Sequence, residues 1–184
     1  MAEDSDPFGF TAAARHYQVS VELLKAISYV ESRHKNTAIN KGTFDGNPDQ
    51  GHMQVHSGTW RKKLGEARWK RMLEDPKFST MIGAWILRGY INAHGNNWNA
   101  VCAYHTNYSL EYLQRKAAQT REQDDIDRYK RGSDYVQKVY AAMKMYMDKD
   151  TASKYGKEPV EQQRVATAKQ EYWGEDDRPL RSSN

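Results

Sequence analysis

The segment DPKFSTMIGAWILRGYINAHG, residues 75–95, carries the strongest helical pattern of the chain. Asp75 is the expected helix cap, Pro76 stands at the first helical position, and His94-Gly95 ends the pattern. The segment therefore predicts a long helix whose apolar stripe packs in the core of a mainly helical domain. The stripe consists of Phe78, Met81, Ile82, Trp85, Ile86 and Ile91.

Helical periods also lie on both sides of this segment. Thr11 is the expected cap of a short helix over 12–17, and Ser20 is the expected cap of the next helix, which ends near residue 34. Residues 40–51 are rich in Gly, Asn and Asp, and predict a long loop or a small hairpin. Further helices are expected over 54–64, after a cap at Asn96 or Asn97, and over 109–120, 122–131 and 134–147.

The composition is that of one sizeable domain without disulfides. The chain has 184 residues, a mean hydropathy of −0.98, a net charge of +4 and a pI of about 9.0. Its one cysteine, Cys102, excludes an intramolecular disulfide and a cysteine-based zinc site. No stretch approaches the ~20 apolar residues of a transmembrane helix, and the acidic N-terminus lacks the apolar core of a signal peptide.

The pattern predicts three parts of the chain. Residues 1–9 are an N-terminal extension, residues 10–147 form a single globular helical domain, and residues 148–184 form a charged C-terminal extension. The last part loses the helical period and is rich in Lys, Glu, Gln and Asp. Because its acidic and basic residues nearly balance, this extension does not predict a nucleic-acid-binding tail.

One carboxylate merits attention, because Glu31 extends the apolar stripe of the helix that Ser20 caps. Loss of solvation at the border of a core is expected to raise its pKa, as a general acid near neutral pH requires. The polar loop that follows offers backbone donors and room for a ligand, and these features together fit glycoside cleavage. The alternative is a solvated glutamate, or one paired with Arg15, Arg33 or Lys35.

Four short motifs follow one another along the chain: Glu31-Ser32-Arg33, Ala38-Ile39-Asn40, Gly51-His52-Met53-Gln54-Val55 and Ala103-Tyr104-His105. With Tyr135-Val136 on the last helix, they resemble the motifs of the lytic transglycosylases, which belong with the goose-type lysozymes in the lysozyme-like superfamily. The resemblance covers roughly residues 10–147 and is nearest to compact members associated with secretion, conjugation or pilus systems.

The resemblance implies a mainly α fold of the lysozyme-like α+β superfamily, built around a groove that binds glycan. It implies cleavage of the β-1,4 bond from N-acetylmuramic acid to N-acetylglucosamine in peptidoglycan, without water, cofactor or metal. One glutamate protonates the glycosidic oxygen and then acts as base, while the muramoyl 6-hydroxyl attacks the anomeric carbon and leaves a 1,6-anhydro end. The N-acetyl group of the substrate stabilises the cation, so no second carboxylate is required as nucleophile.

Carried onto this sequence, the resemblance assigns the acid/base role to Glu31. Ser32 would hold the helix of the glutamate or its hydrogen-bond surroundings, and Tyr104 would donate a hydrogen bond that orients it. Tyr135 is expected in a supporting role.

The same resemblance assigns four further residues to the groove. Gly51 would allow close approach of the backbone, and Met53 would form an apolar wall. Gln54 would donate to sugar or N-acetyl groups, and Asn40 falls at a small polar position.

The sequence departs from the family pattern at four places. Residues 33–37 stand where the family usually has Asn-Pro, and His52 stands where it has leucine. Residues 105–107 replace Asn-Ala-Gly, and residues 42–48 form a longer stretch than in the compact relatives. These changes bear on the shape of the sugar-binding subsites more than on the chemistry.

Three other features have both a functional and a structural interpretation. Asp45 or Asp49 would make the protein a hydrolase if one of them activated water opposite the glutamate, although loop aspartates more often support turns. His52 and His56 have a spacing that suits a metal on a helix, but no third ligand is evident and no metal is predicted. The basic run 61–71 predicts an anion-binding or solvated helix face and lacks a nucleic-acid motif.

The function predicted from these features is a monomeric peptidoglycan lytic transglycosylase. The alternatives are a hydrolytic muramidase on the same fold and a peptidoglycan-binding assembly module of a secretion apparatus. The expected partners are peptidoglycan strands and components of a secretion, conjugation or pilus assembly, with no nucleic acid and no membrane span. The expected location is periplasmic or otherwise extracytoplasmic after removal of a leader, and the alternatives are export by a dedicated secretion path and a phage particle.

Overall fold

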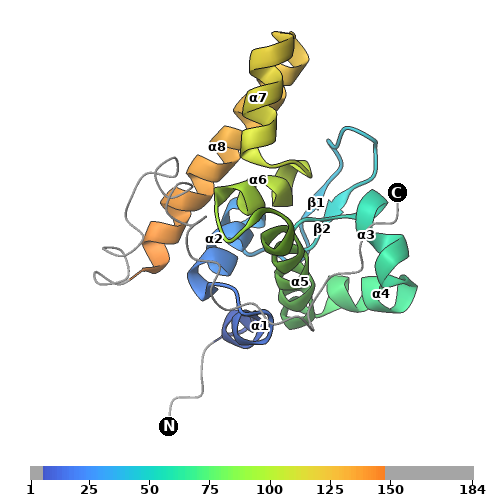
Figure 1. Cartoon of the computed structure of the whole chain (residues 1–184). Coiled ribbons are helices and arrows are strands. Elements are labelled where there is room, and N and C mark those ends of the chain that lie inside the picture. The colour runs from blue at the N-terminus through green and yellow to red at the C-terminus, as the bar shows by residue number, and fades with distance from the viewer. Residues whose placement is uncertain (1–5, 148–184) are drawn as a thin grey trace. The chain divides into compact units, whose positions relative to one another are not determined.

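The computed structural model describes residues 6–147 (Figure 1). The chain divides into two compact units, Met1–Trp85 and Ile86–Asn184, with the boundary inside helix α5 (Pro76–His94). Each unit is mainly helical, which confirms the predicted fold class. The predicted C-terminal extension, 148–184, lies outside the described residues.

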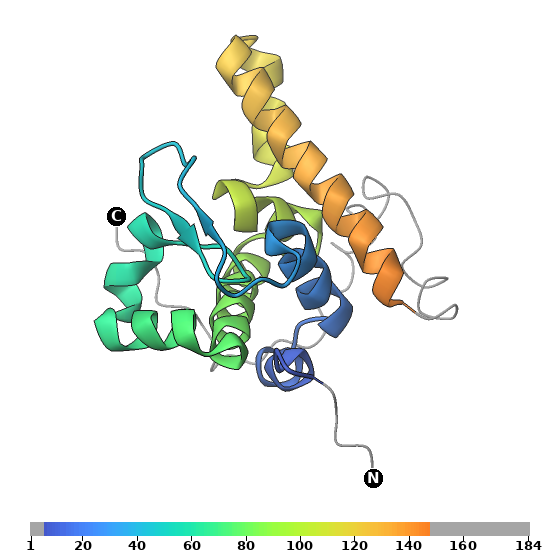
Figure 2. The ribbon, with the colours of Figure 1, turned by 180° about the vertical axis from the view of Figure 1, so that it is seen from behind.

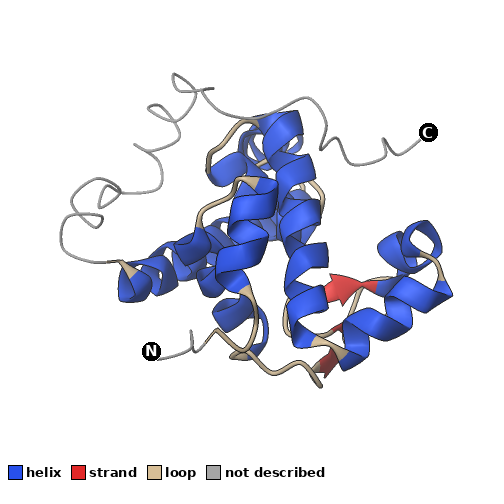
Figure 3. Ribbon diagram, turned by 90° about the horizontal axis from the view of Figure 1, so that it is seen from below, coloured by secondary structure: helices blue, strands red, loops and turns tan. Residues whose placement is uncertain are grey.

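The first unit contains, besides the start of α5, four helices and one small antiparallel sheet within residues 6–85. The helices are α1 (Phe10–Tyr17), α2 (Val21–Ser32), α3 (Ser57–Leu64) and α4 (Glu66–Glu74). The strands are β1 (Ile39–Asn40), β2 (Asp49–Gln50) and β3 (Val55–His56), in the order β1-β2-β3, drawn in red in Figure 3.

Side chains before the first two helices set where those helices begin. The Ser20 hydroxyl accepts a hydrogen bond from Leu23 N at 3.1 Å, which confirms it as the cap of α2. Helix α1 begins at Phe10, and the Asp6 carboxylate accepts from Thr11 N at 2.8 Å. The prediction of Thr11 as a cap is therefore wrong, because Asp6 satisfies a helix donor from outside and Thr11 lies within the first turn.

Residues 39–50 form a hairpin, one of the two structures predicted for this polar stretch. Strands β1 and β2 pair, and loop 41–48 joins them (Figure 2). Strand β2 also pairs with β3, so α3 starts at Ser57 and not at Gln54 as predicted. The ladder hydrogen bonds hold Val55 and His56 extended, Gln54 lies in the preceding turn, and tertiary pairing overrides the helical period.

A buried polar network joins α2 to the loop before β3 and to the first turn of α5. The Ser28 hydroxyl lies 2.8 Å from His34 Nδ1 and 2.7 Å from His52 Nδ1. His52 Nε2 lies 3.0 Å from the Pro76 carbonyl oxygen and 3.1 Å from the Thr80 hydroxyl. A carbonyl oxygen can only accept, so Nε2 carries the proton of the neutral ring and Nδ1 accepts from Ser28. The Ser28 oxygen then accepts from His34, and the hydrogen bonds run in one direction.

Two phenylalanines cover this network. Phe8 and Phe10 pack against the His52 ring at centroid distances of 4.8 Å and 5.9 Å. The Thr80 hydroxyl donates to the Phe8 carbonyl oxygen at 2.6 Å, which fastens the N-terminal segment to α5. As a result His52 has no exposed surface.

The second unit continues from α5 into three further helices within residues 86–147. Asn97 accepts from Asn99 N at 2.8 Å, which confirms it as the cap preceding α6. None of the helices formed by residues 6–147 is both long and apolar enough to cross a membrane. The three helices are α6 (Trp98–Thr106), α7 (Leu110–Thr120) and α8 (Gln123–Tyr146), and α7 and α8 run side by side (Figure 2).

Helix α8 is continuous, although the sequence predicts two helices over 122–131 and 134–147. Gly132 lies in its middle and is buried. A Cβ atom at this position would lie 2.8 Å from Cys102 Sγ and 3.1 Å from Leu113 Cδ1. Glycine therefore allows α8 to approach α6 and α7 closely, and it does not end the helix.

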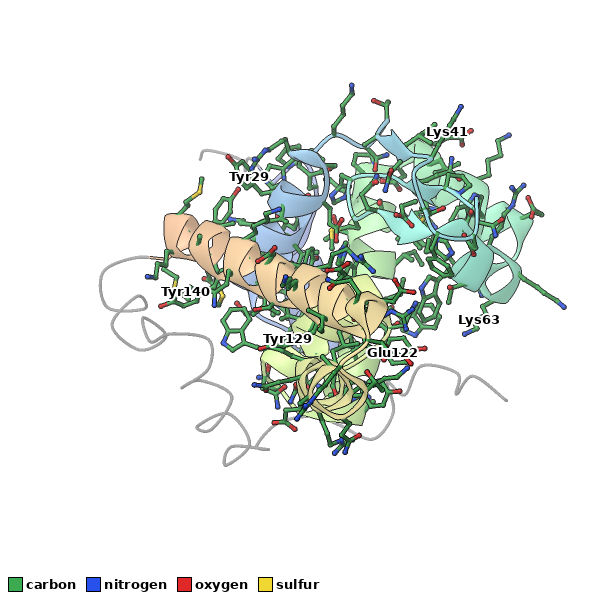
Figure 4. The ribbon with its side chains drawn as sticks, turned by 90° about the horizontal axis from the view of Figure 1, so that it is seen from above. Tyr29, Lys41, Lys63, Glu122, Tyr129 and Tyr140 are labelled. Carbon is green, nitrogen blue, oxygen red and sulfur yellow. The ribbon has the colours of Figure 1, made fainter. Side chains whose placement is uncertain are left out.

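Trp98 belongs to the core of the second unit. Its indole is 5% exposed and packs edge-on against the Tyr140 ring of α8, labelled in Figure 4, at 5.6 Å. The interpretation of Trp98 as a core residue, one of two given by the sequence, is thereby confirmed.

Replacing Gly132 by valine is expected to destabilise the protein by about 2–3 kcal/mol, because the new methyl groups would overlap Cys102 and Leu113. Thermal unfolding followed by circular dichroism measures the change. Gln137→Val, on an exposed position of the same helix, is the matched control and should cost well under 1 kcal/mol. Equal losses in the two variants would show that Gly132 has no packing role.

The buried His52 ring predicts acid sensitivity. Burial lowers the pKa of His52 from 6.5 to about 4, outweighing the hydrogen bond to Pro76. The unfolded chain therefore binds a proton between pH 6.5 and 4 that the folded chain does not, and stability falls as the pH is lowered through that window. The shift corresponds to about 3 kcal/mol.

Chemical denaturation of the wild type and of His52→Leu at pH 7 and pH 4 tests this. The stability difference between the two proteins should shrink at the lower pH. His16→Leu, at an exposed histidine of α1, is the control and should leave the pH dependence of the wild type in place. A constant difference between wild type and His52→Leu would contradict the assignment.

Candidate active site

Glu31 is the penultimate residue of α2 and is half-buried. The helix ends directly after it through two residues in the left-handed region, Arg33 with φ 57° and His34 with φ 62°. Their N–H groups bond back to carbonyl oxygens of the last turn, and the Arg33 guanidinium lies 4.0 Å over the Tyr29 ring. Two successive non-glycine residues in this conformation store backbone strain, which tertiary contacts must offset.

Ser32 ties this helix end to the loop that precedes β3. Its hydroxyl donates to the His52 carbonyl oxygen at 2.9 Å and accepts from Lys35 N at 3.0 Å. On the previous turn, Ser28 bonds the His52 ring. The backbone next to Glu31 is therefore held against residues 51–54 by two hydrogen bonds to one histidine.

The loop itself has an unusual backbone. Gly51 has φ 79°, and a Cβ there would lie 3.1 Å from the Ser79 hydroxyl, so glycine is required for both conformation and space. Gln54 also has a positive φ, 48°. Its Nε2 donates to the carbonyl oxygens of Gly51 at 2.8 Å and Ala38 at 3.3 Å. The amide nitrogen expected to reach a sugar thus serves to close the loop in this structure.

Met53 and Asn40 differ in exposure. Met53 has no exposed surface and packs under α5, where a Cβ at Gly83 would lie 2.6 Å from its Cε. It supports the loop from the core side. Asn40 is exposed on β1, donates to the Asp49 carboxylate at 3.2 Å and accepts from Gly42 N at 3.0 Å.

Tyr104 and Tyr135 belong to the second unit, so their predicted roles near Glu31 stay predictions. Tyr104 is half-buried on α6, and Tyr135 of α8 is 5% exposed and stacks on the His105 ring at 4.3 Å. Asn107 occupies the position where the family has glycine and adopts φ 65°, which asparagine tolerates. The departure in sequence therefore still allows a left-handed turn after α6.

This turn is fastened on two sides. The Thr106 hydroxyl lies 2.9 Å from the Cys102 carbonyl oxygen and accepts from Tyr108 N at 3.2 Å. Tyr90 of α5 donates to Asn107 Oδ1 at 2.6 Å. Burial raises the pKa of Tyr90 to about 12, so the hydroxyl remains a donor at any physiological pH.

The two candidate second carboxylates, Asp45 and Asp49, both bind His56. His56 Nε2 lies 3.1 Å from Asp45 and Nδ1 lies 2.9 Å from Asp49. Each ring nitrogen thus lies within hydrogen-bond distance of one carboxylate oxygen, and the ring links the two aspartates. Hydrogen bonds from Asn47 N, Asn47 Nδ2 and His56 lower the pKa of Asp45 to about 2. The His56 bridge, as we name these three residues, is internal to the hairpin and its neighbouring strand.

The remaining candidate features have structural roles. His52 and His56 bind different partners and do not converge, and within residues 6–147 no group of three or more His, Cys, Asp or Glu side chains has an arrangement that could hold a metal ion. The basic run 61–71 lies on α3 and α4 with exposed cations, which is the solvated face given as one interpretation. Its ion pairs are Arg61–Glu66, Lys70–Glu74 and Arg71–Asp75.

Six of the predicted site residues therefore lie in the first unit and share one connected loop system: Glu31, Ser32, Asn40, Gly51, Met53 and Gln54. The prediction missed Ser28 and the structural use of His52. A buried hydrogen bond between residues 24 positions apart has no local signal, so only the histidine in place of leucine was visible in the sequence.

The chain is mainly helical, has one small three-stranded sheet in its described residues, and carries a glutamate at the end of α2 beside a glycine-containing loop. These features place it in the lysozyme-like class. The family is defined by a direct match: residues 8–128 match the Transglycosylase SLT domain, and the chain belongs to this family. This match confirms the family that the motifs around Glu31 predict.

Several known proteins are similar over much of this region. Invasion protein IagB of Salmonella typhimurium (strain SL1344) is 37% identical over 99 residues, which cover 53% of this chain and 61% of the relative. X polypeptide of Escherichia coli is 32% identical over 119 residues, covering 61% and 68%. Protein IpgF of Shigella flexneri is 29% identical over 118 residues, covering 63% and 74%. The matched region thus spans about three fifths of the length of IagB.

Proposed function

We propose that the protein is a peptidoglycan lytic transglycosylase with Glu31 as its general acid and base. The observation that carries the proposal is the strained end of α2, where Ser32 and Ser28 hold the glutamate against the Gly51–Gln54 loop. Membership of the Transglycosylase SLT domain family supports the same activity.

In the proposed reaction Glu31 first gives its proton to the glycosidic oxygen between N-acetylmuramic acid and N-acetylglucosamine. The bond from the anomeric carbon to that oxygen breaks, and the N-acetyl group of the substrate stabilises the cation. The carboxylate of Glu31 then takes the proton of the muramoyl 6-hydroxyl as its oxygen bonds to the anomeric carbon. The glutamate returns to its acid form, and the products are a 1,6-anhydro end and a free 4-hydroxyl, with no water consumed.

The geometry of the aspartates favours this reaction over hydrolysis. An inverting hydrolase would need a second carboxylate, besides Glu31, that can accept a proton from water. Asp49 accepts from His56 and from Asn40, and Asp45 accepts from Asn47 and His56. A carboxyl whose pKa is held near 2 is also a weak base, so Asp45 is poorly suited to the role.

Other residues would bind the glycan around the cleaved bond. The exposed Asn40 would offer hydrogen bonds to sugar hydroxyls, whereas Gly51 is buried and bonded to Ala38 and Gln54, so its contribution would be to the shape of the loop. Tyr104 would orient Glu31. These roles follow the family pattern.

We further propose that the protein acts outside the cytoplasmic membrane, where peptidoglycan lies, and opens the wall for a secretion, conjugation or pilus assembly. The similarity to a protein named as an invasion protein supports this setting. Fractionation of cells that express the native gene, with immunodetection, tests the location. Recovery of the protein in the cytoplasm alone would contradict the proposal.

Replacing Glu31 by glutamine is expected to lower the rate of wall lysis by about 10³-fold or more, because glutamine can neither give nor take the proton. Clearing of a suspension of purified peptidoglycan sacculi measures the rate. Circular dichroism should show an unchanged fold.

The matched control is Glu22→Gln, the same change at the other end of the same helix, which should keep the activity of the wild type. If Glu31→Gln lyses sacculi as fast as the wild type, the protein is a binding or assembly module and the catalytic proposal fails.

The nature of the product distinguishes the transglycosylase from a muramidase. Mass spectrometry of the released glycan should show 1,6-anhydro ends in the wild type and in Asp45→Asn and Asp49→Asn, since neither aspartate is expected to activate water. Reducing ends with added water would instead identify a hydrolase. Loss of those ends in one of the two variants would then identify its base.

A further inference from the structure

Phe44 lies in the hairpin loop 41–48 and is 89% exposed, the largest exposed fraction among the exposed large apolar residues of the described chain. The loop is otherwise polar. In the sequence Lys41, which is labelled in Figure 4, precedes Phe44, and Asp45 and Asn47 follow it. This is also the stretch in which the sequence is longer than in the compact relatives it resembles. An exposed aromatic ring in water has no stabilising role by itself.

The loop is ordered by its own side chains. The Thr43 hydroxyl donates to the Asn47 carbonyl oxygen at 2.6 Å, and Asp45 Oδ1 accepts from Asn47 N at 2.9 Å. Asp45 Oδ2 accepts from Asn47 Nδ2 at 3.1 Å. These bonds surround Phe44 on both sides in the chain and fix the backbone that carries it.

The loop is also docked onto the start of α3. The His56 bridge connects Asp45 to strand β3, and Ser57 N donates to the Pro48 carbonyl oxygen at 3.0 Å. Gly58 lies under the contact: a Cβ there would be 2.9 Å from Asn47 Nδ2, Asp45 Oδ2 and His56 Nε2. A Cβ at this position would force these three side-chain ends to move, so glycine allows the contact between the loop and α3 in its present form.

The Phe44 ring itself is positioned by the bridge. It stacks on the His56 ring with centroids 5.8 Å apart and planes 19° apart. The imidazole ring lies behind one face of the phenyl ring, and most of Phe44 is left open to solvent. Because the loop backbone that carries the ring is already ordered, a ligand that stacks on the ring pays less ordering entropy.

We propose that Phe44 is a saccharide-stacking position that binds one pyranose ring of the glycan strand outside the cleaved bond. The inference rests on the proposed function, which identifies the ligand as a glycan strand of peptidoglycan. The ligand chemistry follows from the surroundings, because one aromatic face bordered by hydrogen-bonding side chains matches a sugar ring, which has an apolar face and a hydroxyl rim. A protein-docking surface would instead present a cluster of apolar side chains.

The position is connected to the candidate active site through one strand. Strand β2 ends at Gln50, directly before Gly51, and five residues lie between Phe44 and Gln50. At about 3.3 Å per residue over these six steps, the Cα atom of Phe44 lies at most about 20 Å from that of Gln50, within the span of a few sugar rings. A glycan strand bound along the Gly51–Gln54 loop would therefore need only a few more sugar rings to reach Phe44.

Binding of the full chain to glycan tests the proposal, with Glu31→Gln in every protein so that the ligand is not cleaved. The probes are purified sacculi and glycan strands freed of their stem peptides by an amidase. Phe44→Ala should weaken binding to both probes about fivefold, the order of one aromatic stacking contact. Phe44→Trp should retain binding, and Phe44→Leu should lose it, because leucine keeps apolar area and lacks a flat face.

Two further variants isolate the position of the ring. Gly58→Ala keeps Phe44 but displaces the loop, and it should weaken binding to a similar extent with the fold intact by circular dichroism. Met145→Ala removes an exposed apolar side chain from α8 and is the control that should bind like the parent.

Parental binding by Phe44→Ala or Phe44→Leu would overturn the proposal, and parental binding by Gly58→Ala would overturn the requirement for a docked loop. A loss seen with sacculi but absent with peptide-free strands would identify the stem peptide as the ligand and would also overturn it. Failure of the proposed function is recognised separately, since it appears as absent anhydro ends in proteins that retain Glu31, whatever the residue at position 44.

Discussion

The first unit depends on the hydroxyl of Ser28, which lies between two histidine rings in a buried site. Neutral His52 accepts from this hydroxyl and donates to the first turn of α5, so one ring connects a helix, a loop and a second helix. Buried polar groups cost free energy unless their hydrogen bonds are made. Here the Pro76 carbonyl oxygen, which can only accept, determines the tautomer of His52 and, through Ser28, which nitrogen of His34 donates. The network thereby specifies a single arrangement of α2 against residues 51–54, and it does so only while His52 is uncharged.

That arrangement explains how a strained helix end persists beside Glu31. Arg33, His34 and Gln54 all adopt left-handed backbone conformations, each of which costs on the order of 1–3 kcal/mol. Ser32 and Ser28 supply bonds across to the same loop, so the strain and its compensation lie within a few residues of one another. A carboxylic acid on such a rigid support loses little of its effect to side-chain or backbone motion, which suits one residue that must act first as acid and then as base.

A third histidine organises the hairpin beside this site. Asp45 and Asp49 each meet one nitrogen of the His56 ring, and this bridge both occupies the two aspartates and contacts the aromatic ring of Phe44. Carboxylates that a sequence offers as second catalytic groups thus have a conformational role. Their engagement favours a transglycosylase over an inverting hydrolase, because a transglycosylase needs no second carboxylate to activate water.

The sequence by itself determined the helices with clear periods or caps, such as α2 after Ser20 and α5 after Asp75-Pro76, and it determined the family through short motifs in fixed order. These are local properties, because capping and helical periodicity involve residues three or four apart. Tertiary structure alone decided that Val55 joins a sheet, that Gly132 lies inside a continuous α8, and that His52 is buried beneath Phe8. Each of these depends on groups distant in sequence, whose packing and hydrogen bonds outweigh the weak conformational preference of the residue itself.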